Sequence, residues 1–150
     1  MMKKVPQSYS GREFSQNVLS EAEIRYLSTK KQRQDILLKD FTYADFKKIL
    51  EKAPFSLSEW AEMLYVSERT LHRYANGDGS FNGLQIERIL LLEKMIDAAG
   101  ELFDLNGFKN WLSYKPYALN GTSVKEMLLT HDGIQEVRDL IGRIQYGVAS

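Results

Sequence analysis

The apolar residues of this chain recur at intervals of three and four, with short polar segments between the groups. One such group, Phe46, Ile49 and Leu50, lies on a single face of a helix. That helix is expected to begin after Thr42 and to stop at Pro54. Beyond a loosely patterned N-terminal stretch, every segment is typical of a helix or of a short connector. The pattern therefore predicts an all-α fold.

The segment 56–74 has the pattern of two short helices joined by a tight turn. Ser56 and Glu59 have the capping-box spacing that starts the first helix, and Ser67 is placed to cap the second. The side chains expected to face inward are Trp60, Ala61, Leu64, Leu71 and Tyr74. This spacing is typical of a helix-turn-helix, whose second helix enters the major groove of DNA.

The second of these helices carries the candidate DNA-binding residues. They are Ser67, Arg69, Thr70, His72 and Arg73. Arginine can address a guanine edge or a phosphate, and threonine a phosphate or a thymine methyl group. The alternative for His72 is a surface histidine without a role. A plain helical hairpin is the alternative for the whole segment, and Tyr65, where such turns usually have glycine, argues for it.

A long apolar segment follows, from Gly83 to about Phe103, and we expect it to be the longest helix of the chain. Its apolar residues cover more than one helical face, so it must be buried on two sides. We interpret it as a spine that joins the helix-turn-helix to a C-terminal domain, and as a candidate dimer interface. Charged residues within it argue against a membrane role: Glu87, Arg88, Glu93, Lys94 and Asp97.

The glycine-rich link before this helix has some features of a calcium-binding loop. The residues at the ligand positions would be Asn76, Asp78, Ser80 and Glu87. Phe81 stands where such a loop requires glycine, and the first ligand is a neutral amide. We therefore expect no metal site and no cofactor.

Composition and charge narrow the class of protein further. The 150 residues suffice for one well-buried domain or two small ones, and the absence of cysteine excludes disulfides and thiolate metal sites. The absence of cysteine also fits a cytoplasmic protein, and the N-terminus lacks an apolar signal segment. Residues 1–75 carry 13 Lys and Arg against 10 Asp and Glu, and residues 76–150 carry 7 against 10. This weak polarity suits a chain with one end facing phosphates.

Catalysis is the competing class of function. The two histidines, His72 and His131, stand in no recognisable metal or nucleophile spacing, and no glycine-rich phosphate loop is present. We therefore expect that the protein is not an enzyme.

The C-terminal third contains a further set of residues in a characteristic order: Trp111-Leu112, Pro116, Ala118-Leu119-Asn120-Gly121, Leu128, Thr130, Gly133, Val137, Leu140 and Arg143-Ile144-Gln145-Tyr146-Gly147-Val148. In these residues and their spacing, this third of the chain resembles the toxin-binding domain of Xre/MbcA/ParS-like antitoxins. Upstream, Ser67 to Arg73 resembles the recognition helix of the same family. The resemblance divides the chain into an N-terminal extension (1–40), a helix-turn-helix domain (41–82), a connecting helix (83–105) and a toxin-binding domain (106–150).

The resemblance implies a type II antitoxin, which pairs with a RES-domain toxin that degrades NAD or with an ADP-ribosyltransferase-like toxin. Its C-terminal domain would occlude the toxin's cleft, and its helix-turn-helix, as a homodimer, would bind operator DNA and repress the operon. The alternative is a stand-alone repressor whose C-terminal domain only dimerises.

An active-site plug needs a rigid base and a protruding tip, and the last helix and its end could supply both. The candidate toxin-binding residues are Asn120, Arg143, Tyr146, Gly147 and Val148. The alternatives are a salt bridge within the domain for Arg143 and a core position for Tyr146. Asn120 also suits a purely structural role in the turn with Gly121.

Overall fold

The structure is a computed structural model that describes residues 20–147, and for residues 31–39 it describes the backbone alone. Every regular element in the described residues is helical, so the prediction of an all-α fold is confirmed. The described residues separate into two compact units, residues 20–39 and residues 40–147. No helix of the described residues is long and apolar enough to cross a membrane.

The first unit contains most of α2 (Glu21–Asp40), a continuous helix of 20 residues. A capping box starts this helix: the Ser20 amide donates to Glu23 Oε2 at 2.9 Å, and the Glu23 amide donates to Ser20 Oγ at 3.2 Å. This helix exceeds the 18-residue α6, so the prediction that the helix beginning at Gly83 is the longest was wrong.

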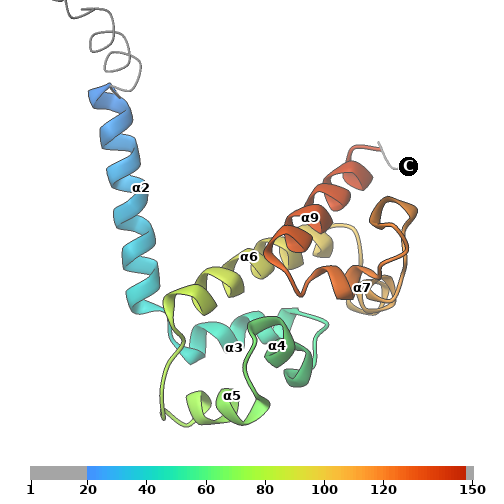
Figure 1. Ribbon diagram of the computed structural model, residues 1–150, viewed down its shortest axis with the longest axis horizontal. Coiled ribbons are helices and arrows are strands. Elements are labelled where there is room, and N and C mark those ends of the chain that lie inside the picture. The colour runs from blue at the N-terminus through green and yellow to red at the C-terminus, as the bar shows by residue number, and fades with distance from the viewer. Residues whose placement is uncertain (1–19, 148–150) are drawn as a thin grey trace, which may run out of the picture. The chain divides into compact units, whose positions relative to one another are not determined.

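The described part of the second unit consists of eight helical elements. They are α3 (Tyr43–Lys52), α4 (Leu57–Leu64), α5 (Glu68–Ala75), α6 (Gly83–Gly100), α7 (Leu105–Leu112), the 3-10 helix η1 (Tyr117–Leu119), α8 (Val124–Met127) and α9 (His131–Gln145). Helix α6 contacts α3 and α4 as well as α7 and α9 (Figure 1). Its buried residues are Ile86, Ile89, Leu92, Met95, Ile96 and Ala99. The expectation that this helix is buried on two sides is thus confirmed.

Helix α6 ends at Gly100 rather than near Phe103, because the next helix starts almost at once. The Asp104 side chain accepts the Gly107 amide at 2.6 Å and so fixes the first turn of α7. Leu102 and Phe103 lie in the bend between the two helices. The Phe103 ring stacks on Trp111 with 5.2 Å between their centres, which fastens the bend to α7.

Phe81, in the link between α5 and α6, anchors the packing of the helix-turn-helix. Its side chain is buried, and its ring centre lies 5.0 Å from that of Phe46 and 5.2 Å from that of Tyr74. The rings of Phe41 and Tyr43 complete the cluster. The large apolar residue that breaks the calcium pattern therefore closes the core of the helix-turn-helix.

An ion pair joins α4 to α8: Lys125 Nζ lies 3.0 Å from Glu59 Oε2. Burial by itself would raise the pKa of Glu59. The hydrogen bond and charge of Lys125, together with the Ser56 amide and hydroxyl, outweigh it and hold that pKa below its usual range. A carboxylate with a depressed pKa stabilises the fold above its unfolded-state pKa of about 4.3, and this contribution is lost as the pH falls through the lower, folded-state value.

Lys125→Gln should therefore lower the free energy of unfolding at pH 7 by up to about 1 kcal/mol, because the pair is partly exposed. The variant should also lose less stability than the wild type on acidification below pH ~4.3. Urea unfolding between pH 3 and 7 measures both effects, with Lys115→Gln, an exposed lysine, as the control for lost charge. Parallel pH profiles of Lys125→Gln and the wild type would contradict this role.

Candidate functional site

Helices α4 and α5 form the expected helix-turn-helix, and both are capped as the sequence predicts. The Ser56 amide donates to Glu59 Oε1 at 3.2 Å, and the Glu59 amide donates to Ser56 Oγ at 3.1 Å. The turn closes on Tyr65, whose backbone is left-handed with φ of 56°. Its amide donates to the Glu62 carbonyl at 3.2 Å, so the turn forms although glycine is absent.

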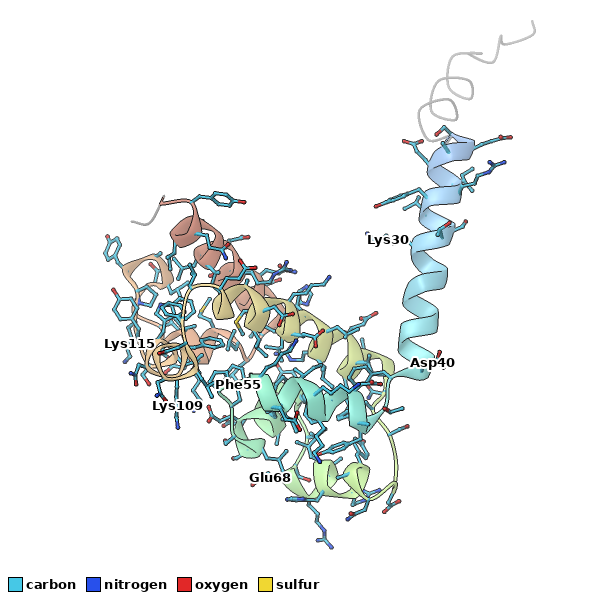
Figure 2. The ribbon with its side chains drawn as sticks, turned by 180° about the vertical axis from the view of Figure 1, so that it is seen from behind. Lys30, Asp40, Phe55, Glu68, Lys109 and Lys115 are labelled. Carbon is cyan, nitrogen blue, oxygen red and sulfur yellow. The ribbon has the colours of Figure 1, made fainter. Side chains whose placement is uncertain are left out.

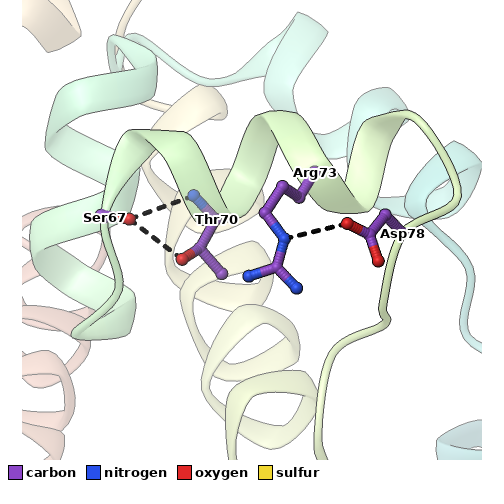
Figure 3. A network of polar contacts seen from close by, with 4 residues as sticks. All are labelled: Ser67, Thr70, Arg73 and Asp78. Carbon is purple, nitrogen blue, oxygen red and sulfur yellow. Dashed lines mark hydrogen bonds and ion pairs between the residues drawn. The ribbon is translucent and has the colours of Figure 1, made fainter.

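Two of the candidate DNA-binding residues form hydrogen bonds with each other at the N-terminus of α5 (Figure 3). Ser67 Oγ accepts the Thr70 amide at 3.1 Å and lies 2.9 Å from Thr70 Oγ1. Ser67 is exposed and Thr70 is half-buried. Together they fix the N-terminal turn of α5, the part of a recognition helix that meets base edges.

The other three candidates are exposed along α5, and Leu71 between them is fully buried. Arg73 is not independent, because its Nε lies 3.1 Å from Asp78 Oδ2 in the link after the helix (Figure 3). Both side chains of this pair are more than half exposed. Asp78 therefore offsets part of the positive charge that Arg73 would bring to a phosphate, an effect the sequence analysis missed.

The candidate toxin-binding residues at the end of α9 form an exposed tip on a buried base. The base is the apolar face of α9, made by Ile134, Val137, Leu140 and Ile141. Tyr146 is 85% exposed, so the alternative of a core position for its ring was wrong. Arg143 is exposed and forms no ion pair with any side chain that the structure describes. Gly147 is left-handed with φ of 71°, and Val148 lies outside the described residues.

Asn120 and Gly121 shape a turn. Both backbones are left-handed, with φ of 53° and 76°, and the turn follows the buried Leu119. Asn120 is exposed, so its side chain is accessible as well. The structure thus assigns these two residues a backbone role and leaves a contact by Asn120 as a prediction.

A surface that the sequence analysis missed surrounds η1. Tyr117 is 93% exposed and Tyr114 57% exposed, on either side of the buried Pro116. The segment is held in place by the Val124 amide, which donates to the Tyr114 carbonyl at 3.1 Å. Residues 105–125 contain three lysines and no acidic residue, and Lys109 and Lys115 are labelled in Figure 2. This run of residues without a negative charge was the feature of the sequence that could have indicated an exposed binding surface here.

Two family models match the chain, one after the other. Residues 36–94 match the antitoxin Xre-like helix-turn-helix domain, and residues 98–147 match the antitoxin Xre/MbcA/ParS C-terminal toxin-binding domain. Among curated relatives, "Antitoxin Xre" of Yersinia enterocolitica serotype O:8 / biotype 1B is 37% identical over 87 residues, 57% of this chain and 59% of that protein. "Antitoxin Xre" of Photorhabdus laumondii subsp. laumondii is 29% identical over 107 residues, 69% of this chain and 71% of that protein.

The fold and the exposed face of α5 define an all-α protein of the helix-turn-helix class with a second helical domain on the same central helix. The two domain matches occur in the order expected from the sequence and together span almost all of residues 36–147. The chain belongs to the Xre family of antitoxins. The alignment with the Yersinia relative spans 59% of that protein's length.

Proposed function

We propose that this protein is the antitoxin of a type II toxin-antitoxin pair, which binds a toxin through its C-terminal domain and represses its own promoter through the helix-turn-helix. The observation that carries the proposal is the presence, in one chain, of a capped recognition helix with exposed arginines and of the adjacent match to a toxin-binding domain. The curated relatives bear the name antitoxin, which supports the same conclusion.

The toxin class follows from the family resemblance: a RES-domain enzyme that degrades NAD, or an ADP-ribosyltransferase-like enzyme. Arg143 could pair with carboxylates that line such a cleft, and Tyr146 could bury its exposed ring in it. Tyr117 and Tyr114, exposed around η1, are two further candidate contacts in the same domain. Binding DNA as a homodimer would match the two half-sites of a palindromic operator.

Co-expression with the product of the adjacent gene tests this function. Growth arrest by that product alone, rescue by this protein and co-purification of the two would support an antitoxin. Neither toxicity nor a complex would instead favour a stand-alone repressor whose C-terminal domain only dimerises.

Tyr146→Ala should weaken capture of the toxin by about 10- to 30-fold, because a fully exposed ring that becomes buried at an interface contributes about 1.4–2 kcal/mol. Tyr117→Ala tests the second face in the same way. Tyr26→Ala, an exposed tyrosine outside the matched C-terminal domain, is the control and should bind normally. Isothermal titration with a catalytically inactive toxin provides the affinities, and wild-type affinity for Tyr146→Ala would remove this residue from the interface.

A further inference from the structure

Arg88, half-buried on α6, is bonded at once to the helix-turn-helix and to the C-terminal domain. Its Nε donates to the Met63 carbonyl in the last turn of α4. Its Nη2 donates to the Leu128 carbonyl at the end of α8, at 3.2 Å. One planar guanidinium thus links backbone acceptors that lie 65 residues apart in the sequence, an arrangement that its fixed fork of donors suits well.

Tyr65, the residue at the turn between α4 and α5, completes this junction. The Arg88 Cζ atom lies 4.8 Å from the centre of the Tyr65 ring, a cation-π contact. The Tyr65 hydroxyl donates to the Leu129 carbonyl, next to the carbonyl that Arg88 uses. A left-handed backbone favours glycine over tyrosine, so the side-chain contacts account for a tyrosine at this position.

Apolar packing between α4 and α8 is incomplete at the same place. A pocket of about 270 Å³ opens there, with Met63 and Leu129 in its wall. Besides the contacts of Arg88 and Tyr65, the Glu59–Lys125 ion pair spans the two helices at 3.0 Å. Polar and cation-π contacts, rather than a continuous apolar interface, therefore supply much of the direct link between the turn and the C-terminal domain.

We propose that Arg88 is a positioning residue that, through Tyr65, fixes the turn of the helix-turn-helix to the C-terminal domain and so orients α5 for DNA. The proposal rests on the proposed function of α5 in operator binding. It makes the C-terminal domain part of the DNA-reading unit. A toxin bound to that domain would then change operator affinity through these contacts, and DNA would change toxin affinity by the same factor.

Three variants separate the side-chain contacts from the backbone conformation. Arg88→Gln removes the guanidinium, and Arg88→Lys keeps the charge without the planar fork. Tyr65→Gly keeps a left-handed turn, at lower conformational cost, and removes the ring and hydroxyl. Lys94→Gln, an exposed lysine on the same helix, is the control for the loss of one positive charge.

Hydrogen exchange tests the positioning directly. Arg88→Gln and Tyr65→Gly should speed exchange of the Thr70 and Leu71 amides at least fivefold, because the turn that holds the start of α5 is released. Exchange within α9 should stay unchanged in both variants and show that the fold persists. Arg88→Lys should be intermediate, and Lys94→Gln should match the wild type. Wild-type exchange of these two amides in Arg88→Gln would overturn the proposal.

The functional readout uses a labelled duplex of the DNA directly upstream of the gene. Arg88→Gln should bind it at least fivefold more weakly, whereas toxin capture should stay within twofold. Toxin capture should persist because Arg88 lies far from the toxin-binding tip. Glu101, which accepts a hydrogen bond from Gln145 next to that tip, is about 20 Å farther along α6 than Arg88. Equal operator binding by Arg88→Gln and Lys94→Gln would overturn the proposal. If the wild type fails to bind the duplex, the DNA-binding function fails, and the exchange experiment still decides the role of Arg88.

Discussion

Replacing Arg69 and Arg73 together by alanine is expected to weaken operator binding at least 100-fold and to leave toxin capture within twofold. Both side chains are exposed on α5. A well-placed arginine contributes about 1–3 kcal/mol in discrimination at a base edge, and a dimer would lose every such contact twice. Toxin capture should persist because the candidate tip lies at the end of α9, in a different part of the chain.

Fluorescence anisotropy with the upstream duplex measures the loss of operator affinity. Repeating it at several salt concentrations shows how much of that loss is electrostatic. Where an arginine contacts phosphate, its removal should also flatten the dependence of affinity on salt. Lys109→Ala with Lys115→Ala removes the same charge from the C-terminal domain and should leave operator affinity nearly unchanged. Asp78→Asn should strengthen binding, because it frees Arg73 and removes an anion next to it. If both double variants lost operator affinity equally, the effect would come from net charge and not from contacts made by Arg69 and Arg73.

Local signals predicted the start of α3, α4 and α5. Capping by a serine or threonine involves residues only three apart, and the hydrogen bonds of Thr42, Ser56 and Ser67 are all present. Helical periodicity likewise predicted the two-sided burial of α6. These features depend on contacts within one turn or on one face of one helix, and such contacts are visible in a linear sequence.

Long-range partners were not visible in the same way. Tyr65 counted against a helix-turn-helix, because the side chain that compensates for its left-handed backbone lies on α6 and the carbonyl that it contacts lies 64 residues away. Phe81 was identified only as a residue that spoils a calcium loop, although its ring belongs to an aromatic cluster gathered from α3 and α5. Rules based on neighbouring residues cannot identify contacts between residues so far apart in the sequence.

Among the exposed residues of the candidate site, too, local features were predicted and long-range ones were not. The pattern placed Arg69 and Arg73 outward, because the inward face of α5 was set by Leu71. It gave no indication that Asp78 would pair with Arg73, or that Tyr117 would project from the turn around η1. Exposure of an aromatic side chain in a connector depends on how the flanking residues are anchored, here by the buried Pro116 and Leu119.

Gly133→Ala is expected to destabilise the fold by about 3 kcal/mol or more, and Gly142→Ala in the same helix to stabilise it by about 0.5–1 kcal/mol. A Cβ atom on Gly133 would lie 1.9 Å from the Met127 carbonyl oxygen and 2.8 Å from Thr130 Oγ1. The first obstacle is backbone, which no rotamer change can relieve. A Cβ atom on Gly142 would meet nothing within 4 Å, so alanine there only raises helix propensity.

The steric conflict at Gly133 would also displace the start of α9. The Gly133 amide donates to Thr130 Oγ1 at 3.0 Å, and this cap and the alanine methyl group would compete for the same space. Since Ile134 and Val137 are fully buried, a shift of α9 disturbs its packing on α6. Urea unfolding should separate the two variants by several kcal/mol, with opposite signs relative to the wild type. Toxin capture should fall in Gly133→Ala alone, because α9 carries the toxin-binding tip that includes Arg143 and Tyr146.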